Sequence, residues 1–187
     1  MTLQEQLYPL VRRTFWALFL LFLDFNFNLG SAFTLPFLPN CAGWWMLLEV
    51  CTGGAALRPS LGLLKPFCGV LAVYSLLQFF PGIEAQMPIA VTLLVSILTI
   101  YTYFQFFTDL AALIGEIPGA EELSRRLLHE RTVIVVLSSI MYCYDLLIHL
   151  PALAMLAMVI VFCIYVYILY QFWQLTKALS APQPQSL

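Results

Sequence analysis

Residues 87–113 read MPIAVTLLVSILTIYTYFQFFTDLAAL, and Asp109 is the single charged side chain in this stretch. The hydrocarbon core of a bilayer is about 30 Å thick, and about 20 predominantly apolar residues in helical form cross it. Backbone polar groups satisfy one another inside such a helix, so it needs no hydrogen-bond partner from the lipid. The stretch therefore predicts a transmembrane helix.

The remainder of the chain has the same character. Of its 187 residues, 62% are hydrophobic and only 10% are charged, whereas soluble domains carry about 25% charged residues. Further apolar segments, separated by prolines and polar turns, lie at about 14–32, 41–57, 61–80, 132–150 and 152–175. We therefore predict an all-α, polytopic membrane protein with six transmembrane helices in one domain, 1–180, and a disordered tail at 181–187.

Basic residues orient this topology. With six spans and a cytoplasmic N-terminus, all the Lys and Arg residues fall on the cytoplasmic side: Arg12, Arg13, Arg58, Lys65, Arg125, Arg126, Arg131 and Lys177. This asymmetry follows the positive-inside rule. Tryptophans, which favour membrane interfaces, stand at the inner boundary (Trp16, Trp173) and at the outer boundary (Trp44, Trp45). We expect a multi-pass protein of the cell membrane with both termini in the cytoplasm.

The first apolar segment allows two other interpretations. An arginine pair, the apolar stretch and Gly30-Ser31-Ala32 together resemble a secretory signal peptide. Asp24 and Asn26 interrupt the apolar region, so we expect the segment to be retained as a membrane helix. Alternatively, the segment ends near Asn28, and residues 28–40 form a re-entrant or interfacial cap.

Ionisable groups at membrane depth are costly, about 2.5 to 3.5 kcal/mol each on insertion scales, so each one indicates a candidate functional site. Segment 132–150 sets a polar series four, three and four residues apart, which places it on one helical face: Ser138, Tyr142, Asp145 and His149. Segment 87–113 has a similar series: Thr92, Ser96, Thr99 and Tyr103. Asp24 and Asn28 add a third face, with Asp24 near the midplane.

These faces predict one polar cavity that opens to the outside. Its proposed ligand- or ion-binding residues are Asp24, Asn28, Tyr142, Asp145 and His149. Because the outer halves contain no Lys or Arg, unpartnered carboxylates there favour a proton, a metal ion, another cation or a cationic solute. The alternative is structural: the hydroxyl faces hold helices together, and the Asp–His pair satisfies itself.

Two further acids lie in apolar segments. Asp109 stands close to the inner surface, where we expect it to reach water or Arg131. Glu49 lies near the midplane, and Arg58 or Lys65 can extend toward it from the cytoplasmic side. Glu49 and Lys65 therefore form a second candidate site.

Short motifs add faint resemblances. Asn28-Leu29-Gly30, Leu38-Pro39 and Gly43-Trp44 are similar to an N-L-G…L-P-x-x-x-G-[YW] arrangement in small bacterial membrane proteins, although Asn40 stands where such proteins tend to carry Asp. This pattern implies no activity. Chain length and helix number resemble those of the substrate-binding S subunits of energy-coupling-factor transporters, a likeness of architecture that does not fix function.

The sequence lacks a complete catalytic set. Glu121-Glu122 followed by Arg126 is similar to the E-E-x-x-x-R motif of CAAX-protease-like membrane proteins, which also need histidines on later helices, whereas this chain has only His129 and His149. Five cysteines include no C-x-x-C pair, so neither a redox couple nor a zinc site is indicated, and no cofactor is predicted. The net charge of −2 offers no basic face for nucleic acid.

The leading hypothesis is thus a small binding or transport protein embedded in the membrane. A non-catalytic partner or assembly subunit is the second hypothesis, and a membrane enzyme is the third. Under the second, the cytoplasmic amphipathic loop 115–131 docks another protein, and its E-E-L-S-R-R-L-L-H-E core forms a short helix on the membrane surface.

Overall fold

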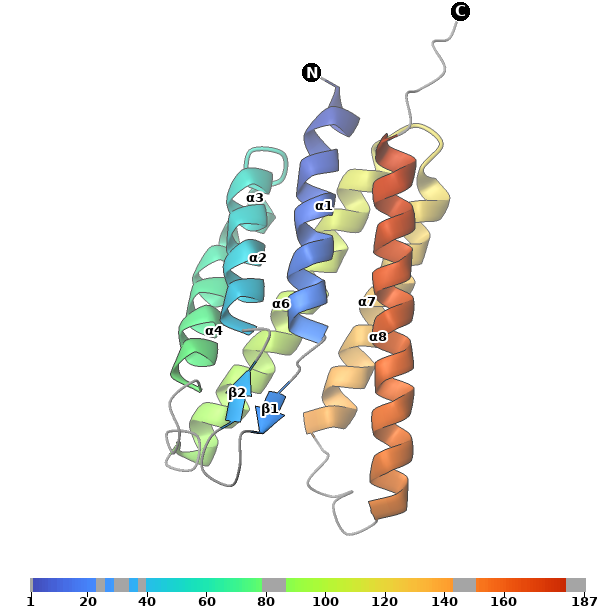
Figure 1. Cartoon of the computed structure of the whole chain (residues 1–187). Coiled ribbons are helices and arrows are strands. Elements are labelled where there is room, and N and C mark those ends of the chain that lie inside the picture. Colours follow the sequence, from blue (N-terminus) through green and yellow to red (C-terminus); the bar gives the residue numbers. More distant parts are fainter. Residues whose placement is uncertain are drawn as a thin grey trace, which may run out of the picture.

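The computed structural model describes residues 2–22, 26–28, 34–36, 40–78, 87–142 and 151–180, with backbone only at 26–28, 34–36, 141–142, 151–155 and 157–158. The helices are α1 (Leu3–Phe22), α2 (Asn40–Gly54), α3 (Pro59–Leu63), α4 (Lys65–Leu77), α6 (Ile89–Gly115), α7 (Glu121–Tyr142) and α8 (Pro151–Ser180). They run roughly along one direction as a bundle (Figure 1), and the start of α1 lies at the same end as the end of α8.

Within the described ranges, three stretches of helix are long and apolar enough to cross a membrane. They are Pro59–Leu77, which comprises α3 and α4, then Ile89–Gly115 and Val159–Ser180. Large apolar side chains are exposed on their outer faces, and Ile89 and Ile97 are examples. Such surfaces suit lipid and are unfavourable in water. The predicted helical fold is confirmed, and these three stretches support the prediction of a membrane protein.

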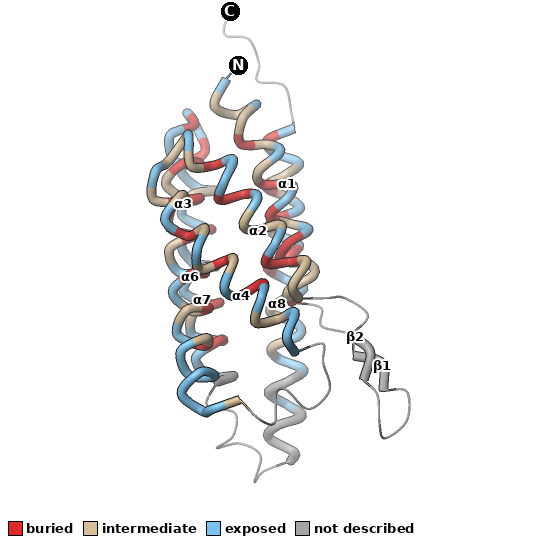
Figure 2. Tube along the Cα trace, turned by 90° about the vertical axis from the view of Figure 1, so that its left-hand side faces the viewer, coloured by how far each residue is buried: buried red, intermediate tan, exposed pale blue. Residues whose placement is uncertain are grey.

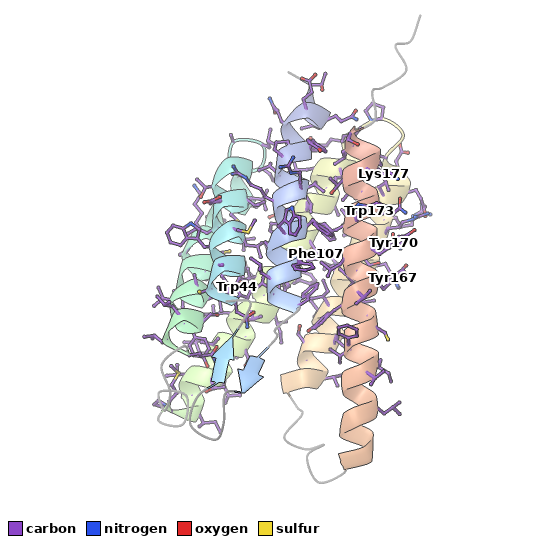
Figure 3. All side chains as sticks on the ribbon, in the orientation of Figure 1. Trp44, Phe107, Tyr167, Tyr170, Trp173 and Lys177 are labelled. Carbon is purple, nitrogen blue, oxygen red and sulfur yellow. The ribbon has the colours of Figure 1, made fainter. Side chains whose placement is uncertain are left out.

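Helix α6 provides much of the packed core. Nine residues between Thr102 and Ile114 are buried, and Phe106 and Phe107 are fully covered. The Phe107 ring meets Phe172 of α8 edge-on, with centroids 5.5 Å apart, and Figure 3 shows Phe107 in the middle of the bundle. Buried positions alternate with exposed ones along each helix (Figure 2). Every described helix therefore presents one face to its neighbours and another to the surroundings.

The first helix differs from the predicted range 14–32. It begins at Leu3, so the amphipathic lead-in belongs to it, and it ends at Phe22. Strand β1 (Asn26–Asn28) then pairs antiparallel with β2 (Thr34–Pro36), in the register Asn26↔Pro36. Asn and Pro are poor helix formers, which explains why the apolar run does not continue as a helix. The prediction that Asn28 lies in the first helix was therefore wrong. Strand β2 lies within residues 28–40, the range considered above as a re-entrant or interfacial cap.

The predicted loop 115–131 is also shorter than expected. A turn follows α6, in which Gly119 has a φ of 80°, and α7 begins directly at Glu121. The charged core expected as a separate surface helix is thus the first part of α7. The structural reason is that Leu127 and Ile134 are both buried on one face, so a single helix continues through both segments.

A close approach of α1 and α2 depends on a glycine. A Cβ atom added at Gly43 would lie 2.7 Å from Leu21 Cγ and 3.0 Å from the carbonyl oxygen of Ala17. Small residues at such crossings let two backbones approach each other in membrane proteins. Gly43 therefore sets the separation of the two helices beside the site described below.

We expect Gly43→Ala to lower the free energy of unfolding by about 1–3 kcal/mol, because the added methyl overpacks the α1–α2 contact. Gly69→Ala is the matched control, since a Cβ at Gly69 in α4 would meet nothing within 4 Å. That control should be neutral or stabilising by up to about 1 kcal/mol, from helix propensity. Thermal unfolding of the purified variants measures both. Equal stability of the two variants would contradict the close contact.

Candidate functional site

A polar cavity of about 380 Å³ lies in the half of the bundle farther from the termini. It is enclosed by the C-terminal end of α1, the N-terminal end of α2, the C-terminal half of α4, the N-terminal half of α6, and parts of α7 and α8. Six helices thus contribute to its wall. We call this end of the molecule the cavity end.

One wall is the hydroxyl series that the sequence singled out on α6. Thr92, Ser96, Thr99 and Tyr103 all line the cavity, and Ser138 of α7 joins them. Four residues of the first polar face and Ser138 of the second therefore line one cavity. The other members of the second face, Tyr142, Asp145 and His149, lie outside the described side chains. Helical spacing explains why four positions on α6 share one side of the helix.

Some hydroxyl groups in this wall have a hydrogen-bond partner in the protein, and others do not. Ser96 Oγ donates a hydrogen bond to the carbonyl oxygen of Thr92 at 2.9 Å. Thr99 and Ser138 are both buried, yet in the described part of the chain neither hydroxyl makes a hydrogen bond. Because polar groups inside proteins are normally hydrogen-bonded, these two hydroxyls are suited to a bound solute or water.

Aromatic side chains also line the cavity. Trp44 of α2 stacks on Tyr103 with ring centroids 5.4 Å apart. The ring of Tyr165 of α8 lines the cavity as well, and Phe22 of α1 stacks on it from outside the lining, at 4.3 Å. Tyr74 of α4 completes the aromatic lining. The sequence analysis did not assign Tyr74 or Tyr165 to a site. Their isolated aromatic rings within apolar helices carry no pattern that distinguishes a cavity wall from ordinary core.

Trp44 does not take the position that the sequence predicted. It was expected, with Trp45, at the outer membrane boundary. In the structure Trp44 is 5% exposed and faces the cavity, whereas Trp45 is 59% exposed, and Figure 3 shows Trp44 within the bundle. Adjacent helical residues point about 100° apart, so only one of the pair can face outward.

The structure does not describe the side chains of the residues that were predicted to bind a ligand or ion. Asp24, Asp145 and His149 fall outside the described residues, as do the side chains of Asn28 and Tyr142. The lining residues that the structure does describe are uncharged at neutral pH. Among the described residues, no group of three His, Cys, Asp or Glu side chains could hold a metal ion.

Glu49 has a different partner from the one predicted. Arg13 of α1 approaches it, with Nη1 3.6 Å from Glu49 Oε2, and both side chains are about half exposed. The expected partners were Arg58 and Lys65. Packing of α1 against α2 supplies Arg13 instead, so the second candidate site, Glu49 with Lys65, is replaced by an exposed ion pair.

Asp109 is the most thoroughly buried carboxylate paired in the described structure. It is 1% exposed. Arg58 Nε donates to its Oδ1 at 2.9 Å, Ser60 Oγ donates to the same oxygen at 2.8 Å, and Gln105 Nε2 donates to Oδ2 at 3.1 Å. The bonds from Arg58 and Ser60 tie the start of α3 to α6, and all three donors together satisfy the carboxylate inside the protein.

The expectation that Asp109 reaches water or Arg131 is therefore wrong. Arg131 of α7 donates instead to the hydroxyl of Thr108 at 3.1 Å and lies over the ring of Phe104, 4.5 Å from its centroid. Arg131 thus contacts α6 at Thr108 and Phe104, on a different face of that helix from Asp109.

Comparison with protein-family models, with curated proteins and with solved structures gives no match. The resemblances noted in the sequence therefore stay predictions. The function must be inferred from the chemistry and geometry of this chain.

Loss of the Arg58 side chain should be more damaging than neutralisation of its partner. We expect Arg58→Met to lower the free energy of unfolding by about 3–5 kcal/mol, because it leaves a buried carboxylate without its cation. Asp109→Asn should cost about 1–3 kcal/mol, since the amide oxygen still accepts a hydrogen bond.

Arg13→Met is the matched control for this comparison, because it breaks the exposed pair with Glu49. Exposed pairs contribute at most about 1 kcal/mol. Thermal or denaturant unfolding in detergent ranks the three variants. If Arg58→Met and Arg13→Met lose the same stability, the buried network does not support the fold.

Proposed function

We propose that this protein is a membrane-embedded binding or transport protein whose polar cavity receives a small organic cation. The single observation that carries the proposal is the cavity itself, in which the hydroxyls of Thr99 and Ser138 lie among aromatic rings inside an apolar bundle. A cavity with these groups has little value for packing alone, since apolar side chains would fill it at lower cost. A bound polar solute accounts for them.

The volume of the cavity narrows the class of solute. About 380 Å³ falls in the range of about 300–1,000 Å³ that small-molecule sites occupy. A bare proton or a monatomic ion needs only a few ligands and little space. The proposed solute is therefore a small organic molecule, with a hydroxyl or a similar group for Thr99 and Ser138.

Electrostatics favour a positive charge on that solute. No Lys or Arg occurs among the described lining residues, and Trp44 and Tyr103 present aromatic rings. The negative face of such rings attracts organic ammonium groups. Two carboxylates in the sequence also support a cation. Asp24 comes two residues after α1, and Asp145 comes three residues after α7, and both of these helices contribute to the cavity wall.

A matched pair of probes tests this proposal. Choline and its uncharged isostere 3,3-dimethylbutan-1-ol have nearly the same shape and hydroxyl, so they differ chiefly in charge. We expect choline, and not the isostere, to raise the unfolding temperature of the purified protein. Isothermal titration then gives the dissociation constant. Equal effects of the two compounds, or no effect of either, would remove the case for a cation.

Substitutions on α6 localise the binding. Thr99→Val removes one lining hydroxyl at constant shape, and a lost hydrogen bond of about 0.5–1.5 kcal/mol weakens choline binding roughly threefold to tenfold. Thr102→Val is the control, because Thr102 is buried on the same helix and donates to the carbonyl oxygen of Leu98. Trp44→Leu and Trp45→Leu form a second pair. Only the substitutions at the cavity-lining positions, Thr99→Val and Trp44→Leu, should weaken choline binding.

We also propose that the chain crosses the cell membrane six times with both termini in the cytoplasm. The helix ends that carry basic side chains support this orientation, because they lie at the same end of the bundle as the start of α1 and the end of α8 (Figure 1): Arg58, Lys65, Arg125, Arg126 and Lys177. We call this end the basic end. The positive-inside rule would then place the cavity end outside.

Reporter fusions test that orientation. Green fluorescent protein fused after Leu187 should fluoresce, since it folds in the cytoplasm. Alkaline phosphatase fused within residues 81–86 should be active and, fused after Gly119, inactive, because that enzyme matures only outside the cytoplasm. The reverse pattern at any one of these positions would contradict the proposed topology.

A further inference from the structure

A groove between α7 and α8 at the basic end leads to a buried carboxylate. Its mouth, of about 570 Å³, is lined by residues that include Arg126, His129 and Tyr167. A small recess of about 20 Å³ adjoins it, since both are lined by Arg126, Glu130 and Gln171. The recess has room for about one water-sized group. We call the two parts together the interhelical groove.

Glu130 lacks a hydrogen-bond partner at the bottom of this groove. The residue is 2% exposed, and its Oε2 atom has no partner among the described residues. Burial raises the pKa of the Glu130 carboxyl above its ordinary value, and the nearby His129 partly opposes that rise. An unpaired buried carboxylate is unfavourable, so a donor that enters the groove would stabilise it.

The mouth of the groove carries the opposite charge. Arg125 and Arg126 both approach the one carboxylate of Glu122, at 3.8 and 3.3 Å, and all three side chains are more than half exposed. Because two guanidinium groups share one carboxylate, the mouth of the groove carries a net positive charge. With Glu130 ionised, the formal charges of these four residues sum to zero, and Glu130 is the most buried of them.

Charge separation of this kind complements a zwitterion. A simple anion would meet Glu130, and a simple cation would have to pass two arginines. A ligand with a phosphate and a terminal ammonium can satisfy both ends, because guanidinium groups bind phosphate well and an ammonium provides the donors that Glu130 lacks.

Side chains near the groove place it at the level of lipid headgroups. On α8, Tyr170 and Trp173 are about half exposed, and Lys177 lies over the Trp173 ring, 4.8 Å from its centroid. Figure 3 shows this series along the outer edge of α8, toward the basic end. Exposed Trp, Tyr and Lys side chains in such a series are typical of the membrane–water interface.

We propose that the interhelical groove binds the headgroup of an aminophospholipid of the phosphatidylethanolamine type, with its ammonium at Glu130 and its phosphate at Arg125 and Arg126. Phosphatidylcholine carries three methyl groups on nitrogen and cannot donate a hydrogen bond to Glu130. Phosphatidylglycerol lacks the positive charge. The groove therefore selects one lipid class by the chemistry of the nitrogen.

Native mass spectrometry of the purified full-length protein tests this selection. The protein is incubated with equal amounts of phosphatidylethanolamine, phosphatidylcholine and phosphatidylglycerol of the same acyl chains. We expect the ethanolamine lipid to be preferred. In Glu130→Gln, the preference for phosphatidylethanolamine over phosphatidylcholine should fall about tenfold, because a charge-assisted hydrogen bond is lost.

Glu121→Gln is the matched control, because Glu121 is exposed on the same helix and does not line the groove. It should keep the preference. Glu130→Gln removes an unpaired buried charge, so it should fold at least as well as the original protein, which circular dichroism and thermal unfolding check. Equal binding of the three lipids, or an unchanged preference in Glu130→Gln, overturns the proposal.

A soluble competitor separates the lipid from its headgroup. Glycerophosphoethanolamine in excess should displace part of the bound lipid, which would support recognition through the headgroup. If it instead binds as tightly as the intact lipid, the occupant is a free solute and the lipid assignment is overturned. Choline binding in the polar cavity involves other residues, so either proposal can be disproved without affecting the other.

Discussion

Hydrocarbon offers no hydrogen bonds, so every polar group in the apolar helices must find its partner inside the protein. Most hydroxyls here meet that requirement locally. Thr102 donates to the carbonyl oxygen of Leu98 at 2.7 Å, and Thr176 donates to that of Phe172 at 2.8 Å. Polar groups that are buried without such a partner therefore stand out, because retaining them costs free energy.

Three buried carboxyl or hydroxyl environments illustrate the distinction. Asp109 has three donors from two parts of the chain, so its charge contributes to structure. Thr99 lines a cavity without a hydrogen bond in the described structure, and Glu130 Oε2 has none at the base of a groove. The last two are the groups on which the functional proposals rest.

The two ends of the bundle differ in the kind of chemistry they offer. At the cavity end, described lining side chains are neutral, with stacked rings such as Trp44 and Tyr103. At the basic end, arginines and carboxylates lie close together around α7. A desolvated, uncharged pocket suits selection of a solute by shape and aromatic contact, whereas an exposed charged groove suits a headgroup that remains partly in water.

Apolar runs and their breaks were enough to predict a helical membrane protein, and the range 87–113 lies close to the observed Ile89–Gly115 because length and composition act locally. The same periodicity predicted the hydroxyl face of α6. Tertiary structure decided the partner of Asp109, which is Arg58, 51 positions away, and the inward direction of Trp44. It also placed Glu130 in a groove, although the sequence alone indicated a solvated loop. Periodicity identifies the faces of a single helix, whereas packing over long sequence separations determines which faces meet and which polar groups lose contact with water.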